Sequence, residues 1–211
     1  MPGRRADRGK KVPAKKTAIL GGSFDPVHNG HLALARSARE AFGLEQVVFM
    51  PAACSHLKKT ARMFGDAERL VLLEAAIRGE AGLSLSRLEI ERGAPSWTIE
   101  TALALGASEG DPVFWIIGAD CAATLERWHR AADLARLVHF YAAEREGQPL
   151  VACPGFTVIP FVCPRVDVSS TMVRQRLRDG LPVDGLVPPA VADLITARSA
   201  ECARAQRAGQ G

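Results

Sequence analysis

The segment at residues 21–31, Gly-Gly-Ser-Phe-Asp-Pro-Val-His-Asn-Gly-His, constrains the fold of this 211-residue chain more than any other. A short apolar, β-prone run at residues 17–20 precedes it, and an alanine- and leucine-rich stretch from Leu32 follows it. This pattern predicts a strand that ends at two glycines and a helix that begins near the histidines. Without a Cβ atom, Gly21 and Gly22 let main-chain N–H groups approach a ligand closely.

Two histidines mark the start of the predicted helix. His28 and His31 are three residues apart, so they lie on one face of the first turn. Two imidazoles beside a helix N-terminus are suited to stabilising the charge of a phosphate. A Gly-Gly turn or a lone histidine is ordinary by itself, and His-x-x-His also occurs in metal sites. No cysteine or third histidine lies near in sequence, so no metal site is predicted.

The rest of the chain alternates between strand and helix patterns. The predicted strands after the first lie at residues 46–50, 83–90, 113–117, 137–142 and 157–162. The first predicted helix runs to about Phe42, and the second begins after an N-cap at Asp66 and has Leu70, Leu73 and Ile77 on one face. Further helices are predicted over residues 98–107 and, as two short helices, on both sides of Trp128. The last two begin at Ser169 and at Pro189. This alternation predicts an α/β fold with a doubly wound parallel sheet. Ligands bind such sheets beyond the carboxyl ends of the strands, which brings together 21–31, 51–58, 118–120 and the loop before Ser169.

Charge and composition set the expected boundaries. Residues 1–16 hold seven Lys or Arg and one Asp, which leaves the remaining chain at about −2. We therefore expect a disordered basic extension at 1–16, one domain at 17–200 and a flexible tail at 201–211, with no nucleic-acid partner. No apolar run approaches the ~20 residues of a membrane span, and the N-terminus lacks a signal-peptide core, so a cytoplasmic protein with five reduced cysteines is expected.

Two motifs resemble those of a known family. His28-Asn29-Gly30-His31 matches the (T/H)-x-G-H motif of the nucleotidyltransferase superfamily, and the whole of 21–31 resembles the nicotinate-nucleotide adenylyltransferases. Residues 168–174, Val-Ser-Ser-Thr-Met-Val-Arg, are similar to that family's I-S-S-T-x-I-R. The resemblance covers about residues 17–195 and implies a Rossmann-like nucleotidyltransferase fold.

Three further matches are looser. One is Gly118-Ala119-Asp120 followed by Trp128, which is similar to the family's G-A-D and tryptophan. The indole of Trp128 either stacks on a pyridine ring or belongs to the core. Residues 96–101 resemble S-Y-T-x-D-T, with Trp97 and Glu100 as departures. The family has P-P-H-K where this chain has residues 51–59, and whether His56, Lys58 or Lys59 takes the phosphate-binding role is open.

The resemblance implies the reaction of ATP with nicotinate mononucleotide to give nicotinate adenine dinucleotide and pyrophosphate, in NAD biosynthesis, with Mg²⁺ bound with ATP. The implied catalytic residues are His28, His31, Lys58 and Arg174. The implied ATP-binding residues are Gly21, Gly22, Ser23, Phe24, His28, His31, Gly118, Asp120, Ser169, Ser170, Thr171 and Arg174. Nicotinate mononucleotide is implied to bind Ser23, Phe24, Thr98 and Trp128.

Other function classes fit these residues less well. A Rossmann oxidoreductase is disfavoured because residues 21–26 do not fit G-x-G-x-x-G and no acidic residue ends the second strand. A non-catalytic nucleotide-binding module would not need both His28 and His31. Pantetheine-phosphate and nicotinamide-mononucleotide adenylyltransferases are the alternatives within the superfamily. The oligomeric state, including a homo-oligomer, is left open.

Overall fold

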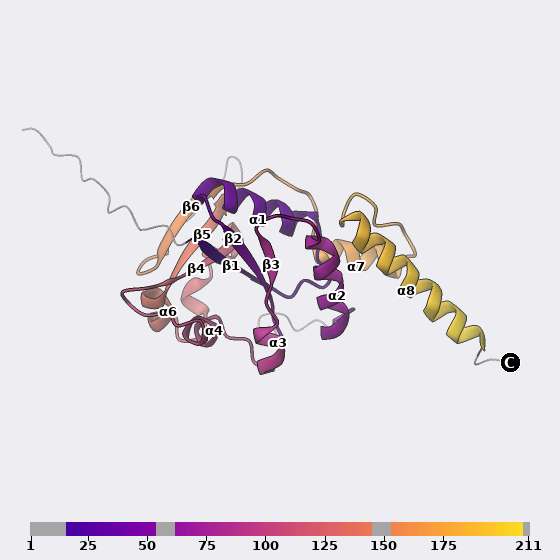
Figure 1. Ribbon diagram of the computed structural model, residues 1–211, viewed down its shortest axis with the longest axis horizontal. Coiled ribbons are helices and arrows are strands. Elements are labelled where there is room, and N and C mark those ends of the chain that lie inside the picture. Colours follow the sequence, from indigo (N-terminus) through magenta and orange to yellow (C-terminus); the bar gives the residue numbers. More distant parts are fainter. Residues whose placement is uncertain (1–15, 54–61, 145–152, 209–211) are drawn as a thin grey trace, which may run out of the picture.

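Six parallel strands form one sheet, in the order β3-β2-β1-β4-β5-β6, in the computed structural model, which describes residues 16–53, 62–144 and 153–208 (Figure 1). The strands are β1 (Thr17–Gly22), β2 (Gln46–Pro51), β3 (Leu83–Leu85), β4 (Val113–Gly118), β5 (Val138–Glu144) and β6 (Thr157–Val162). The helices are α1 (Asn29–Phe42), α2 (Asp66–Ile77), α3 (Leu88–Arg92), α4 (Thr98–Ala104), α5 (Ala119–Ala122), the 3₁₀ turn η1 (Leu125–Arg127), α6 (Ala131–Leu137), α7 (Ser170–Arg178) and α8 (Pro189–Ala208). The predicted doubly wound parallel sheet is confirmed.

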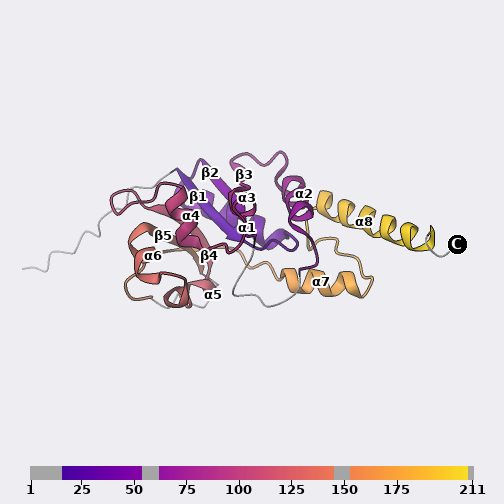
Figure 2. The same cartoon turned by 90° about the horizontal axis from the view of Figure 1, so that it is seen from below.

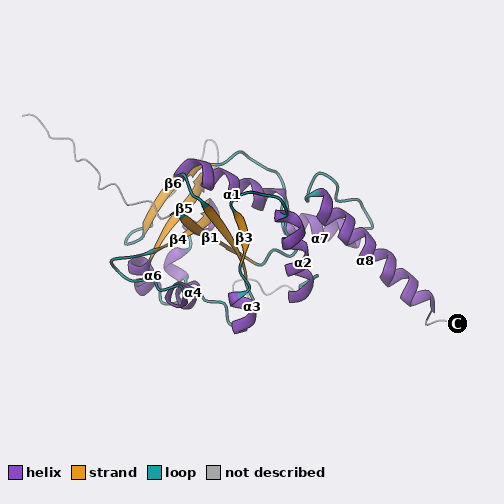
Figure 3. Cartoon of the chain, viewed as in Figure 1, coloured by secondary structure: helices purple, strands orange, loops and turns teal. Residues whose placement is uncertain are grey.

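The helices cover both faces of the sheet, and each strand supplies side chains to both (Figures 2 and 3). On β1, Ala18 and Leu20 belong to the core under α1, α2, α7 and α8, whereas Ile19 belongs to the core under α4 and α6. The same alternation on β4 places Phe114 on one face and Trp115 on the other. Burial on both faces explains why β4 is apolar throughout.

Several predicted elements differ from the observed ones. The strand predicted over 83–90 is wrong beyond Leu85, because the Ser86 hydroxyl accepts the Leu88 amide (3.3 Å) and the chain turns into α3. Helix α4 ends at Ala104, before Gly106, which adopts a positive φ of 82°. Helix α8 begins at Pro189, as predicted, and ends at Ala208.

The N-terminus of α2 also differs from the prediction. Gly65 is the N-cap, and Asp66 is the first helical residue. The predicted buried face of Leu70, Leu73 and Ile77 is shifted by about one position, since the buried residues are Arg69, Leu72, Leu73, Ala75 and Ala76. A buried arginine within this stripe hides its apolar periodicity from sequence analysis.

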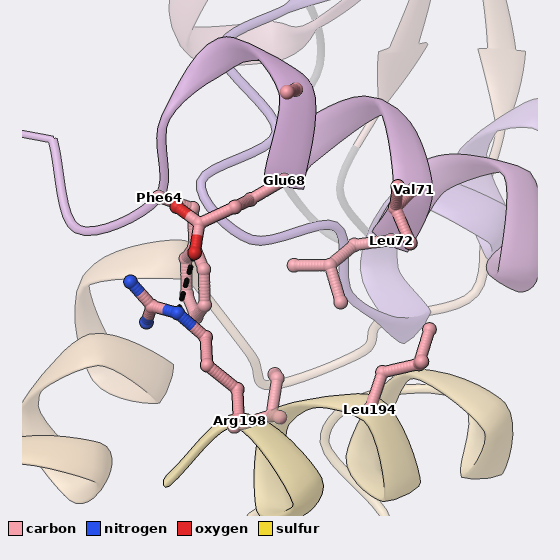
Figure 4. Close-up of a pocket in the computed structure, with 8 residues that line it drawn as sticks. Phe64, Glu68, Val71, Leu72, Leu194 and Arg198 are labelled. Carbon is pink, nitrogen blue, oxygen red and sulfur yellow. Dashed lines mark ion pairs between the residues drawn. The ribbon is translucent and has the colours of Figure 1, made fainter. Parts of the chain in front are cut away.

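Helix α8 is held against α2 by both charged and apolar side chains (Figure 4). Arg198 pairs with Glu68 at 2.5 Å, and its guanidinium lies 4.8 Å from the centre of the Phe64 ring. Val71 and Leu194 line an apolar groove of about 250 Å³ between the two helices. Although α8 has 20 residues, no helix within the described ranges is apolar enough over a sufficient length to cross a membrane.

The buried face of α2 yields a test of the fold. We expect Leu73→Ala to lower the free energy of unfolding by about 2–5 kcal/mol, because it removes a fully buried side chain and leaves a cavity. Glu74→Ala, on the exposed face of the same helix, should change it by no more than about 1 kcal/mol, because Glu74 forms a surface ion pair with Arg87. Urea unfolding measures both, and equal effects would contradict the assigned orientation of α2.

Candidate active site

A cavity of about 360 Å³ opens at the carboxyl ends of β1 and β4. Strand order reverses here, because β1 pairs with β2 on one side and with β4 on the other. Ligands of doubly wound sheets bind at this kind of reversal. The expected residues that line the cavity are Gly21, Gly22, Ser23, His31, Thr98, Gly118 and Trp128.

The glycines of the two strands do different things. A Cβ atom on Gly21 would lie 2.6 Å from Cζ2 of Trp115, so the indole of β4 packs directly on the β1 backbone. A Cβ atom on Gly118 would meet no atom within 4 Å, and the φ of −81° there suits any residue. Gly21 therefore permits strand packing, whereas Gly118 keeps space open at the cavity.

The two histidines form a stacked pair at the start of α1. Their ring centroids are 3.6 Å apart with an interplanar angle of 24°. The His28 amide donates to Nδ1 of His31 at 3.2 Å, so a neutral His31 carries its proton on Nε2. His28 is buried, while His31 lines the cavity with the Phe24 ring packed against it at 4.9 Å. The arrangement presents a donor to an anion in the cavity.

Helix α7 holds the loop that carries these histidines. The Ser170 hydroxyl donates to the Pro26 carbonyl (3.0 Å), and Nη1 of Arg174 donates to the Asp25 carbonyl (2.7 Å). Arg174 also lies 3.9 Å from the Asp25 carboxylate. Oγ of Ser169 accepts a hydrogen bond from the Met172 amide at 3.1 Å and so caps the N-terminus of this helix. The two motifs quoted from the sequence are therefore in direct contact.

The other predicted site residues lie at different distances from the cavity. Phe24 and His28 belong to the loop after β1 and contact His31, which lines the cavity. Ser170 and Arg174 donate hydrogen bonds to carbonyls of the same loop. Asp120 is exposed on α5, and Ser169 and Thr171 are exposed at the start of α7. Lys58, His56 and Lys59 lie outside the described residues.

Aromatic side chains form one wall of the cavity. Trp128 both lines the cavity and contacts the core, because its ring meets Phe140 edge-on at 5.9 Å. Its Nε1 donates to the Thr124 hydroxyl at 3.3 Å. Beside it, Trp97 stacks on His129 at 4.3 Å with an interplanar angle of 21°. Trp128 thus contacts the core, and stacking of its indole on a pyridine ring stays a prediction.

Sequence reasoning missed several polar residues of this region. Asp25 is buried and accepts the amides of Met63 (3.0 Å) and Phe64 (2.9 Å), and its place between two quoted site residues was the available signal. Glu89 lines the cavity and accepts the Thr101 hydroxyl at 2.6 Å. It was missed because its segment was predicted to be a strand. Arg127 and His129, which also line the cavity, flank the quoted Trp128.

Comparison with known proteins agrees with this geometry. The family model described as cytidylyltransferase-like matches residues 19–176. The chain belongs to this family. A relative from Herpetosiphon aurantiacus, "Probable nicotinate-nucleotide adenylyltransferase", is 42% identical over 191 residues, which cover 86% of this chain and 96% of the relative. One of the same name from Bacillus pumilus is 36% identical over 178 residues, covering 84% and 93%.

The fold of the cytidylyltransferase-like chain also matches solved structures. The Plasmodium falciparum nicotinic acid mononucleotide adenylyltransferase complexed with NaAD superposes with a TM-score of 0.67, covering 86% of this chain and 95% of that one. At 16% identity the likeness concerns the fold. The predicted resemblance to the nicotinate-nucleotide adenylyltransferases is confirmed by the relatives above.

The two glycines give a paired prediction. Gly21→Ala should destabilise the protein by about 1–3 kcal/mol, because the new methyl group displaces the Trp115 indole. Gly118→Ala should leave the melting temperature unchanged and weaken ATP binding, because its methyl group enters the space that a nucleotide would fill. Thermal unfolding with and without ATP measures both effects. A destabilised Gly118→Ala that still binds ATP normally would contradict the assignment.

Proposed function

We propose that this protein transfers the adenylyl group of ATP to nicotinate mononucleotide, producing nicotinate adenine dinucleotide and pyrophosphate for NAD biosynthesis. The observation that carries the proposal is the stacked pair of His28 and His31, on a glycine loop at the reversal of strand order. The relatives at 42% and 36% identity, which bear that enzyme's name, support the same substrate.

In the proposed reaction a phosphate oxygen of the mononucleotide attacks the α-phosphorus of ATP. The bond from that phosphorus to the bridging oxygen breaks, and pyrophosphate leaves with the bonding electrons. The substrate supplies the nucleophile, so the protein acts by positioning and by stabilising charge. His31 would donate from Nε2 to the α-phosphate, with His28 stacked behind it.

The charge of the departing pyrophosphate requires further cations. We assign this role to Arg174 and Lys58, as the family resemblance implies. Arg174 places a buried positive charge beside the histidine loop, 2.7 Å from the Asp25 carbonyl. Lys58 follows β2 in the sequence, and β2 itself ends at Pro51, which pairs with Gly22.

Mg²⁺ bound with ATP would neutralise charge on the phosphates. Within the described ranges no group of three or more His, Cys, Asp or Glu side chains is arranged to hold a metal ion. The oxygens of the triphosphate and water are the ligands that Mg²⁺ prefers in such sites. On this preference of Mg²⁺, we assign the ion to the bound nucleotide.

Different residues around the cavity are assigned to the two substrates. We assign the mononucleotide to Ser23, Phe24, Thr98 and Trp128, with the indole of Trp128 against the pyridine ring. We assign ATP to the glycine loop, the histidines, Gly118, Asp120 and the start of α7. The carboxyl end of β4 and the start of α7 flank the loop from two sides.

Pyrophosphate release from ATP tests the proposal directly. The acceptors to compare are nicotinate mononucleotide, nicotinamide mononucleotide, phosphopantetheine and none. Release that depends on nicotinate mononucleotide supports the proposal. Release only with phosphopantetheine would assign the alternative transferase, and ATP binding without release under any condition would indicate a non-catalytic nucleotide-binding module.

Removing the proposed donor gives a sharper prediction. His31→Ala should lower kcat by about 10²–10³-fold and change the KM for ATP far less, because the donor matters most as charge develops. His139→Ala is the matched control, since this histidine lies on β5, packs on Phe114 and does not line the cavity. A folded His31→Ala enzyme with unchanged kcat would refute the catalytic assignment.

The choice of mononucleotide gives a second prediction. A carboxylate only accepts hydrogen bonds, whereas a carboxamide also presents an NH₂ group. Thr98 at the start of α4 and the cationic Arg127 line the cavity, and main-chain N–H groups and a cation both favour the carboxylate. We expect a preference for nicotinate mononucleotide of at least about tenfold in kcat/KM, or roughly 1.4 kcal/mol. Equal kcat/KM values for the two mononucleotides would contradict this account.

A further inference from the structure

Arg69 of α2 is a fully buried arginine whose contacts lie at the edge of the cavity. Its side chain is 0% exposed and sits on the apolar face of the helix, with Leu72, Leu73 and Ala76. Removing a guanidinium from water costs free energy unless hydrogen bonds and an opposite charge compensate it. Its contacts therefore explain why an arginine occupies this buried position.

Those contacts join two loops that are distant in sequence. Nη1 of Arg69 donates to the Ser23 carbonyl, and Nη2 donates to the Ala52 carbonyl at 2.8 Å. Nη2 also contacts Oδ1 of Asp66 at 2.6 Å, which supplies the opposite charge. Ser23 follows β1, Ala52 follows β2, and both line the cavity. One guanidinium thus ties together the ends of two neighbouring strands from behind the cavity wall.

The direction of a carbonyl decides the direction of the next amide. In a trans peptide the C=O and N–H groups point to opposite sides. With the Ala52 carbonyl held by Arg69, the Ala53 amide points the other way and donates to the Ser96 hydroxyl at 2.9 Å. Ser96 lines the cavity two residues before Thr98. The contact with α2 thereby reaches the wall assigned to the mononucleotide.

The contact with Ser23 bears on a strained residue. Phe24 has a φ of 44°, in the left-handed region that non-glycine residues rarely adopt, so the surrounding contacts must hold it. Arg69 holds the carbonyl before Phe24, and Arg174 holds the carbonyl after it. The Phe24 ring in turn packs on His31. Two buried arginines from different helices therefore hold the turn that positions this histidine.

We propose that Arg69 is a positioning residue for the mononucleotide side of the cavity, acting through the Ser23 and Ala52 peptides. This inference rests on the proposed function for its kinetic consequences and on the geometry alone for its structural ones. Arg69 makes no contact with the start of α7 or with Gly118 among its hydrogen bonds and ion pairs in the described structure. Its loss should therefore affect the two substrates unequally.

The test compares Arg69→Met with Leu73→Ala in the full chain. Methionine keeps much of the buried volume without donating hydrogen bonds. Leu73→Ala destabilises the same helix and leaves the Arg69 hydrogen bonds to both loops in place. We expect Arg69→Met to raise the KM for nicotinate mononucleotide by about tenfold or more and to lower kcat, with the KM for ATP within about threefold. The KM of Arg69→Lys for nicotinate mononucleotide should lie between those of Arg69→Met and the unmodified protein. Lysine keeps the positive charge, but its ammonium group lacks the planar fork that serves two carbonyls.

A second measurement does not depend on activity. Hydrogen exchange at the Ala53 amide should be faster in Arg69→Met than in the unmodified protein and unchanged in Leu73→Ala. Only Arg69→Met removes the 2.8 Å hydrogen bond to the Ala52 carbonyl, which then keeps the longer one from Nη2 of Arg62 (3.2 Å). If Arg69→Met matches Leu73→Ala in both exchange and the KM pattern, the role of Arg69 is merely structural and the proposal is overturned. If the unmodified protein transfers no adenylyl group to any acceptor, the proposed function fails, and the exchange comparison still decides the role of Arg69.

Discussion

The position of β1 between β2 and β4 is the constraint on which the site depends. Both neighbours run parallel to β1, so its carboxyl end lies where the sheet order reverses. The strand closes with two glycines, and the first lets the Trp115 indole of β4 lie against the backbone. A side chain at Gly21 would clash with that indole, whose Cζ2 lies 2.6 Å from the position of a Cβ atom. Close strand packing and an open loop are thus satisfied by the same residue type.

The loop after β1 is held from three directions, although it is a connection and not a regular element. The Asp25 carboxylate accepts two amides from the segment before α2, and Arg174 from α7 reaches its carbonyl. Arg69 adds a third attachment at Ser23. A buried carboxylate and two buried guanidinium groups are costly to desolvate, so the hydrogen bonds that compensate them favour one conformation of the loop. A preorganised loop of this kind is what charge stabilisation during phosphoryl transfer requires.

Much of the fold could be predicted from the sequence because its signals are local. The apolar run of β4, the glycine pair at the end of β1 and the start of α7 beside Ser169 each act through neighbouring residues, and each was found where it was predicted. The predicted strand at 83–90 failed because Ser86 redirects the chain through one side-chain hydrogen bond. The helical stripe of α2 was misplaced because Arg69 is polar by type and buried by position.

The sequence by itself determined the alternating α/β order, the histidine loop and the second motif around Ser170, since these depend on spacing within short segments. Only the tertiary structure decided which side chains meet. Arg174 lies 149 residues from Asp25 in sequence and donates to its carbonyl at 2.7 Å. The hydrogen bonds of Arg69, Asp25 and Glu89 likewise join separate segments of the chain. Such pairings leave no periodic pattern, because the energy of a buried charge depends on partners that the chain brings together only when it folds.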